Sequence, residues 1–180
     1  PDKDVPAPDI NTNAVIMKWM LDEYEKLAGK KSPAAFTGKP VEFGGSPARE
    51  QATGFGGFVV LREILKFLGR DSKGLSAAIV GFGNVGSHLA EILDENGFKV
   101  VAVSDSRGAL YAPSGLEVKK VVQDRAKQGH LGKNICYFKP IEGLAEKESC
   151  KVISNEEVLG LEGDVLVPAA IEGSINAKNA

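Results

Sequence analysis

Hydrophobic residues recur at two different periods along the chain, and the change of period predicts an α/β fold. Short apolar runs next to glycine predict strands at residues 75–80 and 99–104, and another buried strand is expected at 164–167. Apolar residues at helical spacing predict a helix over 84–96. Residues 75–104 thus form one strand–helix–strand unit of the usual length. Elements expected further along are a short strand at 109–112, a helix over 116–128 and a short helix that starts at Ser154.

The first 69 residues carry a different pattern. Residues 1–11 hold three prolines and are expected to be extended. Thr12 is expected to cap a helix whose apolar positions repeat as far as Leu27, and Gly29 to end it. A short strand is expected at residues 41–43 within a loop. Ser46 and Pro47 predict the start of a second helix over 46–68, because a hydroxyl cap precedes a proline that needs no amide partner.

This second helix contains Gly54, Gly56 and Gly57 in its first half. Glycine in a helix interior costs about 1 kcal/mol relative to alanine. Either tight packing against another element or a ligand phosphate accounts for that cost, and the sequence does not decide between them.

One glycine-rich turn has the residue pattern of a cofactor-binding site. It follows the strand at 75–80, opens the helix at 84–96, and is followed by a second strand that ends at Asp105. In the dinucleotide-binding fingerprint, the first glycine allows a tight turn, the second lets the pyrophosphate approach, and the third lets the helix pack on the sheet. The chain is therefore predicted to contain a Rossmann-like dinucleotide-binding domain with a parallel-rich sheet. The predicted cofactor-binding residues of this turn are Gly81, Phe82, Gly83, Asn84, Val85 and Gly86.

The end of the second strand bears on the choice of cofactor. Asp105 lies nineteen residues after Gly86, where a carboxylate accepts hydrogen bonds from the adenosine ribose and repels a 2′-phosphate. Ser106 is expected to add a hydrogen bond, whereas Arg107 is suited to a 2′-phosphate. We therefore expect NAD, with NADP or dual use left open; the alternative role of Asp105 is that of a turn aspartate.

Composition narrows the class of protein. The chain has 180 residues, 43% of them hydrophobic and 26% charged, with a net charge of −2, which favours a globular protein and no nucleic-acid or membrane partner. The two histidines and two cysteines lack ligand spacing, so no metal site is expected. A disulfide between Cys136 and Cys150 is open, but reduced thiols and a cytoplasmic location are expected. With no initiator Met, the chain is expected to be an internal piece of a longer polypeptide.

Several strings resemble glutamate dehydrogenases, of the Glu/Leu/Phe/Val dehydrogenase family. The resemblance covers essentially the whole chain, and the hexameric archaeal and bacterial enzymes look most similar. It is carried, in order, by residues 4–9 (DVPAPD), 19–24, 37–40 (TGKP), 44–46, Arg49, 52–54 (ATG), 81–86, 153–157 (ISNEE) and 167–170 (VPAA).

The resemblance implies reversible oxidative deamination of L-glutamate to 2-oxoglutarate and ammonia, with hydride passed to NAD(P). It implies that Asp4 is the catalytic proton carrier, that Thr53 and Asn84 contact the cofactor, and that Ala169 and Ala170 lie over the dinucleotide. Residues 1–45 would then be the end of the substrate domain with its connecting segment, and 46–180 an NAD(P)-binding domain truncated at its C-terminal end.

The substrate-binding lysines of such enzymes lie outside the chain, so these 180 residues alone are predicted to be inactive. A hexamer is implied by the resemblance. The alternatives are a branched-chain or aromatic amino-acid dehydrogenase, against which the string at residues 4–9 argues, and a non-catalytic nucleotide-binding module, against which Asp4 argues.

Overall fold

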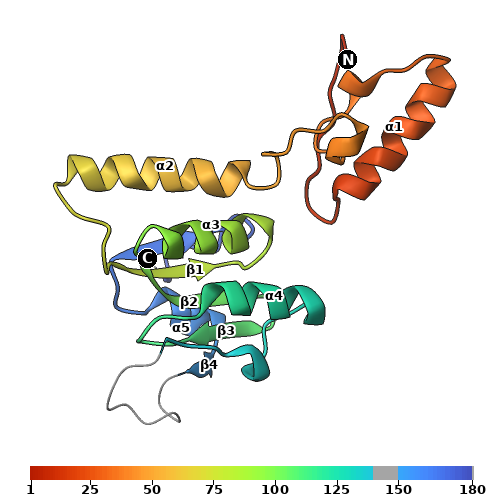
Figure 1. Ribbon diagram of the computed structural model, residues 1–180. Coiled ribbons are helices and arrows are strands. Elements are labelled where there is room, and N and C mark those ends of the chain that lie inside the picture. Colours follow the sequence, from red (N-terminus) through yellow and green to blue (C-terminus); the bar gives the residue numbers. More distant parts are fainter. Residues whose placement is uncertain (140–149, 180) are drawn as a thin grey trace. The chain divides into compact units, whose positions relative to one another are not determined.

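The computed structural model describes residues 1–139 and 150–179, and these fall into two compact units, Pro1–Ala52 and Thr53–Ala180 (Figure 1). Each unit has its own core and is described by itself.

The first unit is built on helix α1 (Ala14–Ala28). The helix begins one residue later than expected: the Asn13 side chain caps it by accepting the N–H groups of Val15 and Ile16. The Thr12 hydroxyl instead bonds back to Asp9, accepting its N–H at 2.6 Å and donating to its carbonyl at 2.8 Å. Gly29, at φ +66°, ends the helix as expected.

The core of this unit is small. It consists of Met17, Leu21, Ala35 and Phe36, with two 3-10 turns, η1 (Pro33–Ala35) and η2 (Val41–Phe43). The second turn replaces the strand expected at residues 41–43: Phe43 N–H donates to the Pro40 carbonyl, and Gly44 N–H to that of Val41. The strand expected at residues 41–43 is therefore wrong, because local i to i+3 hydrogen bonds take the backbone groups.

The second unit is built on a five-stranded sheet with the order β4-β3-β2-β1-β5. The strands are β1 (Ser76–Val80), β2 (Lys99–Asp105), β3 (Gly108–Tyr111), β4 (Lys151–Ile153) and β5 (Val165–Pro168). Strand β1 pairs in parallel with both β2 and β5, whereas β2–β3 and β3–β4 are antiparallel. The expected α/β, Rossmann-like architecture is confirmed; its sheet is mixed, with the parallel part at β2-β1-β5.

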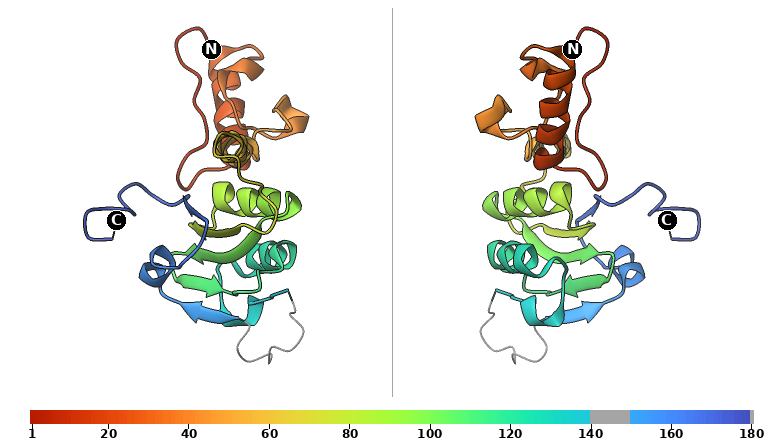
Figure 2. Two further views of the ribbon diagram at one scale, coloured as in Figure 1. Left: turned by 90° about the vertical axis from the view of Figure 1, so that its left-hand side faces the viewer. Right: turned by 90° about the vertical axis from the view of Figure 1, so that its right-hand side faces the viewer.

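Helices cover both faces of this sheet. Helices α2 (Ala52–Phe67), α3 (Asn84–Glu95) and α4 (Val118–Gln128) contribute to the larger core, and α5 (Asn155–Leu159) to a smaller one. Figure 2 shows α5 on the opposite side of the strands from α3 and α4. Alternate residues of each strand face the two cores: Ile79 and Val103 belong to the larger, Val80 and Ala102 to the smaller.

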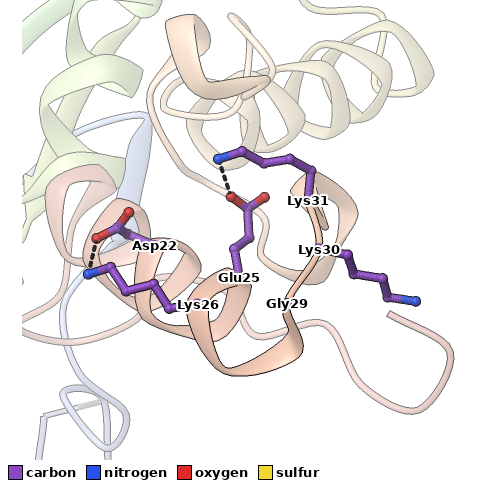
Figure 3. A pocket seen from close by; sticks show the side chains of 6 residues that line it. All are labelled: Asp22, Glu25, Lys26, Gly29, Lys30 and Lys31. Atoms are coloured by element: carbon purple, nitrogen blue, oxygen red, sulfur yellow. Dashed lines mark hydrogen bonds and ion pairs between the residues drawn. The ribbon is translucent and has the colours of Figure 1, made fainter.

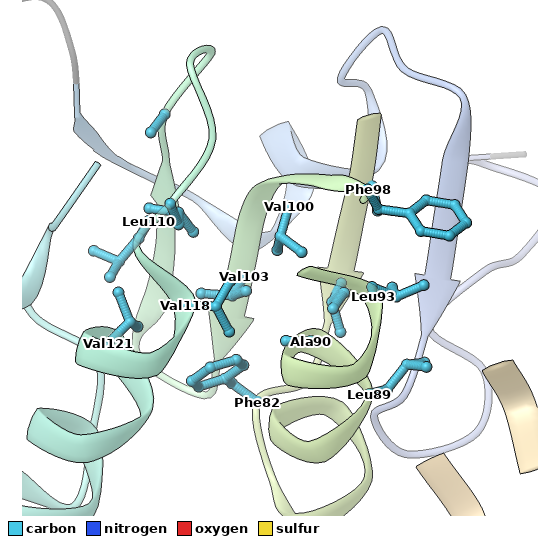
Figure 4. Packing of buried hydrophobic residues seen from close by; sticks show 14 of the residues in the cluster. Phe82, Leu89, Ala90, Leu93, Phe98, Val100, Val103, Leu110, Val118 and Val121 are labelled. Atoms are coloured by element: carbon cyan, nitrogen blue, oxygen red, sulfur yellow. The ribbon is translucent and has the colours of Figure 1, made fainter. Parts of the chain in front are cut away.

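Figure 4 shows the larger core, where side chains from β2 and β3 meet those of α3 and α4. Leu93, Val100 and Val121 are fully buried there. At about 25 cal/mol per Å² of apolar area, each such side chain contributes roughly 1.5–3 kcal/mol to folding. This packing holds β1, β2 and α3 in the arrangement from which the glycine turn projects.

Two further expected boundaries and the burial of one strand differ in the structure. Helix α2 begins at Ala52 and not at residue 46, because the turn in which Arg49 N–H donates to the Ser46 carbonyl does not continue as a helix. Helix α4 begins two residues later than expected because Leu116 N–H pairs with the Val100 carbonyl. The last strand, β5, was expected to be buried but alternates between half-buried and exposed residues, since only β1 pairs with it.

Candidate dinucleotide site

The glycine turn, residues 81–86, lies at the carboxyl end of β1, between β2 on one side and β5 on the other. In open α/β sheets, ligands bind at such a place, where neighbouring strands connect in different directions. The turn leads directly into α3, whose first-turn N–H groups have no earlier carbonyl of the helix to bond. The structure thus gives this turn the position and the helix N-terminus that a phosphate group needs.

Two of its glycines are required by the fold itself. Gly81 has φ +102°, and a Cβ there would lie 2.7 Å from the backbone of Ala169 and Ala170. A Cβ on Gly86 would overlap the Gly81 carbonyl oxygen and lie 3.3 Å from an Ile79 methyl group. These positions admit only glycine because backbone, which cannot move aside, occupies the space.

Gly83 is different. Its φ of −79° suits any residue, and none of the described atoms lies within 4 Å of the place where its Cβ would be. Gly83 is the N-cap residue of α3, where glycine is preferred over alanine or valine but less than serine or asparagine, so helix capping alone does not demand it. A glycine with empty space beside it, next to a helix N-terminus, leaves room for a group that must come close to the backbone.

The other residues of the turn have distinct surroundings. Phe82 is only 1% exposed and packs in the larger core (Figure 4), so only its backbone can meet a ligand. Asn84 is exposed at the first position of α3, and Val85 is half-buried. Phe82 therefore anchors the turn, while Gly83 and Asn84 face outward.

Neighbouring strands complete the edge. Ala169 N–H donates to the Val80 carbonyl at 2.7 Å, which brings the predicted residues Ala169 and Ala170 beside Gly81. On the other side, Gly81 N–H donates to the Ser104 carbonyl at 3.0 Å, with the Ser104 hydroxyl 3.3 Å away. The turn is thus tied to both neighbouring strands.

Asp105, at the end of β2, is already engaged by the protein. One carboxylate oxygen accepts the Arg107 N–H at 2.8 Å, and the other accepts the Leu131 N–H at 2.6 Å. Its carbonyl accepts the Asn155 side-chain amide at 2.9 Å. Asp105 therefore does act as a turn aspartate, the alternative role that the sequence left open. Each carboxylate oxygen still has a second lone pair for a ribose hydroxyl. The sequence offered no signal for Leu131 and Asn155, which are far from Asp105 along the chain.

Ser106 and Arg107 are exposed in the β2–β3 turn. Among the described residues, Arg107 makes no ion pair that would hold its guanidinium away from a ligand. Both side chains are thus available at the same edge as Asp105.

The start of α2 packs on α3. A Cβ on Gly54 would lie 3.1 Å from the Leu89 nitrogen and the Val85 carbonyl oxygen, so tight packing explains this glycine. Gly56 has nothing within 4 Å, and Gly57 only a Leu89 methyl group at 4.0 Å, when the described residues are considered. Thr53, predicted to contact the cofactor, is exposed directly before Gly54.

Asp4 lies in the other unit and so is not among the residues that this sheet edge brings together. Its carboxylate is exposed and accepts the N–H of Val5 at 2.8 Å. The following segment is held in place: Thr37 N–H donates to the Pro6 carbonyl at 3.0 Å, and the Pro8 ring lies against Gly38.

A hollow beside the end of α1 is lined by charged groups that neutralise one another (Figure 3). Lys26 pairs with Asp22 at 2.8 Å, and Lys31 with Glu25 at 2.7 Å. The hydrogen bond from Lys31, with one from Ser32 N–H, lowers the pKa of Glu25. These two pairs use four of the five charged side chains that line the hollow, and Lys30 is the fifth. Its lining residues are Asp22, Glu25, Lys26, Gly29, Lys30 and Lys31.

Among the described residues there is no cluster of three or more histidine, cysteine or acidic side chains that could hold a metal ion. Within the same residues, no helix combines the length and the apolar character needed to cross a membrane. Cys136 and Cys150, expected as reduced thiols, form a disulfide in the structure. The expectation failed because the two residues, separated by 14 positions, have Cα atoms 5.9 Å apart.

Residues 44–180 match the family model described as Glutamate/Leucine/Phenylalanine/Valine dehydrogenase. The chain belongs to this family. It is 43% identical over 180 residues to the cryptic catabolic NAD-specific glutamate dehydrogenase of Bacillus subtilis, and 46% identical over 181 residues to a glutamate dehydrogenase of Thermotoga maritima. It is 41% identical to the NADP-specific glutamate dehydrogenase of Synechocystis. Each match covers the whole chain but only 39%, 40% and 41% of these relatives, respectively.

Solved structures agree with this family membership. The crystal structure of the hetero-hexameric glutamate dehydrogenase of Thermus thermophilus superimposes with a TM-score of 0.84 at 34% identity, over 99% of this chain and 39% of that one. Glutamate dehydrogenase of Plasmodium falciparum superimposes with a TM-score of 0.83 at 27% identity, over 98% and 36%.

Proposed function

We propose that the chain is the dinucleotide-binding part of an NAD(P)-dependent glutamate dehydrogenase. The observation that carries this proposal is Gly83, the N-cap of α3 at the carboxyl edge of the sheet, whose Cβ position has no described atom within 4 Å. The names of the relatives, which include NAD-specific and NADP-specific glutamate dehydrogenases, support the choice of reaction.

In this proposal the pyrophosphate lies against residues 81–86 and receives hydrogen bonds from the first N–H groups of α3. The ribose hydroxyls meet Asp105 and Ser106, and Ala169 and Ala170 lie beside the bound dinucleotide. Thr53 contacts the cofactor from the start of α2. A bound NAD(P) would supply the hydride acceptor for the oxidation of L-glutamate, with water, to 2-oxoglutarate and ammonia. We assign Asp4 the transfer of protons between the amine and water.

The proposal extends to the protein that carries this chain. We assign residues 1–45 to the end of the substrate domain and 46–180 to the cofactor domain, and we propose a cytoplasmic hexamer. The hexameric state rests on the hetero-hexameric enzyme of Thermus thermophilus. Because the chain spans about two fifths of its relatives, we expect no glutamate-dependent reduction of NAD by these 180 residues alone.

The test is calorimetric titration of the chain with NAD and with NADP. Binding of NAD, tighter than that of NADP, is expected because the Asp105 carboxylate repels a 2′-phosphate. Equal or tighter binding of NADP would contradict the role of Asp105 and point to Arg107. Binding of neither dinucleotide would contradict the proposed function.

Substitution of Gly83 tests whether this glycine serves dinucleotide binding or the stability of the fold. Gly83→Val adds a side chain where the structure leaves space but replaces a favoured N-cap residue, so we expect the unfolding free energy to fall by about 1 kcal/mol or less. The same side chain blocks the pyrophosphate, so the dissociation constant should rise at least about 100-fold, and less for Gly83→Ala.

Gly160→Ala is the matched control. It places the same methyl group at the end of α5, on the other face of the sheet, in ordinary contact with the Glu157 carbonyl at 3.8 Å. Its affinity for the dinucleotide should equal that of the unmodified chain. A Gly83→Val chain that still binds normally would remove the main support for the proposal.

A further inference from the structure

The disulfide joins two segments of the second unit that are separate in the fold. Cys136 follows the 3-10 turn η3 (Lys133–Ile135), and Cys150 directly precedes the edge strand β4. Both cysteines are half-buried and pack against the larger core, so small thiols in solution can reach them.

Each of these two segments leads to Asp105. Five residues before Cys136, the Leu131 N–H donates to the Asp105 carboxylate at 2.6 Å. Five residues after Cys150, the Asn155 side-chain amide donates to the Asp105 carbonyl at 2.9 Å. The disulfide therefore links the segment that carries Leu131 to the segment that carries Asn155, and both of these residues donate hydrogen bonds to Asp105.

These two hydrogen bonds hold different groups of Asp105. The Leu131 N–H, together with that of Arg107, orients the carboxylate, and Asn155, at the start of α5, holds the backbone carbonyl of the same residue. If the Leu131 segment shifts, the carboxylate keeps only the Arg107 N–H and is held less firmly. A preorganised acceptor binds a ligand more tightly than a mobile one, because less conformational entropy is lost on binding.

We propose that Cys136 and Cys150 form a reversible thiol–disulfide site that controls how firmly Asp105 is held, and thereby the affinity of the chain for a dinucleotide. The proposal rests on the proposed function for its second half, the effect on the cofactor. Its first half, the effect on Asp105, stands on the contacts described above.

The redox step is thiol–disulfide exchange with a small disulfide such as oxidised glutathione. One cysteine thiolate attacks the glutathione disulfide and releases one glutathione thiolate, which leaves a mixed disulfide. The second cysteine thiolate then attacks the protein sulfur of that mixed disulfide and releases the second glutathione. The two protein thiols lose two electrons and two protons, and the glutathione disulfide is reduced to two thiols.

The first experiment needs no dinucleotide. The chain is equilibrated in glutathione buffers of increasing reduced fraction, the free thiols are counted by alkylation and mass spectrometry, and amide hydrogen exchange is followed at Leu131. We expect reversible pairing of the two thiols and faster exchange at Leu131 in the reduced chain. Thiols that never pair, or equal exchange at Leu131 in both states, would overturn the proposal.

The second experiment measures the NADH dissociation constant of the same samples by fluorescence. We expect the reduced chain to bind roughly three- to tenfold more weakly, the change that corresponds to weakening one hydrogen bond to a charged group. The control carries both Cys136→Ser and Cys150→Ser and should bind like the reduced chain in every buffer.

An NADH affinity that does not depend on the redox state of the unmodified chain, or that rises on reduction, overturns the link to the cofactor. Loss of NADH binding in both states contradicts the proposed function instead. In that case hydrogen exchange at Leu131 still decides whether the disulfide holds Asp105. The unmodified chain is its own reference, so the result does not depend on whether the serine variant folds.

Discussion

The two ends of the same parallel strands are built in opposite ways. At the amino ends of β1 and β5, the Asp164 carboxylate accepts the N–H and the hydroxyl of Ser76 at 2.9 and 2.8 Å, and Arg70 pairs with it at 2.6 Å. The Ser76 hydroxyl also accepts the Asp164 N–H at 2.9 Å. At the carboxyl ends, Gly83 faces open space. One end is closed by its own polar groups, and the other leaves backbone donors for a ligand.

This difference indicates that the amino ends of these strands contribute to stability, and that the carboxyl ends are where a ligand is proposed to bind. A polar group that already has protein partners has little to gain from a ligand, whereas a helix N-terminus with free N–H groups gains from binding an anion. Asp105 lies between these extremes, since it has protein partners at the ligand edge. The predictions below disturb each end in turn.

The largest expected effect is that of Gly86→Ala, at the carboxyl end. The added Cβ overlaps the Gly81 carbonyl oxygen, and the backbone on both sides is held by β1 and α3. We expect the unfolding free energy to fall by more than about 3 kcal/mol, measured by urea denaturation. An unchanged unfolding free energy would show that α3 does not pack as closely against the end of β1 as the structure has it.

Asp164→Asn disturbs the opposite end. Hydrogen bonds from Ser76, then that from Arg70, lower the pKa of Asp164 from 3.8 to about 2. The ionised carboxylate therefore stabilises the fold above pH 4, and this contribution is lost as the pH falls from about 4 through about 2.

The measurement is the melting temperature between pH 6 and pH 2 for both chains. We expect Asp164→Asn to be less stable at pH 6 and to lose less stability on acidification, with NAD affinity at neutral pH unchanged. An identical pH profile for the two chains would show that Asp164 does not close this end. Weaker NAD binding would show that the two ends are not independent.

The smallest effect is expected from Gly56→Ala in α2. Gly56 has no described atom near its Cβ position and lies about 200° around the helix from Gly54, which packs on α3. Alanine should therefore stabilise the chain by about 1 kcal/mol through helix propensity, with NAD affinity within about twofold. Weaker NAD binding would instead assign this glycine to the cofactor, the alternative that the sequence left open.

Much of the second unit was predictable because its signals are local. The strands β1 and β2, helix α3 and the capping box at Ser154 follow from apolar runs, glycine stops and polar caps that act within a few residues. The predicted cap of α1 was wrong by one residue, because Thr12 and Asn13 are both suitable N-cap residues. The Thr12 hydroxyl bonds to Asp9 instead, so the Asn13 side chain caps the helix. Helix α2 starts later than expected because a capping residue followed by proline does not start a helix unless the next residues continue the helical hydrogen bonds.

The sequence by itself determined the strand–helix–strand unit, the glycine turn and the family, because each depends on residue type at fixed spacing along the chain. Only the tertiary structure decided which glycines of the turn the packing requires: the Cβ positions of Gly81 and Gly86 are filled by backbone atoms, and that of Gly83 is not. It also decided that Cys136 meets Cys150 and that Leu131 and Asn155 hold Asp105. These are contacts between residues far apart along the chain, and their distances depend on how the whole sheet and its helices pack.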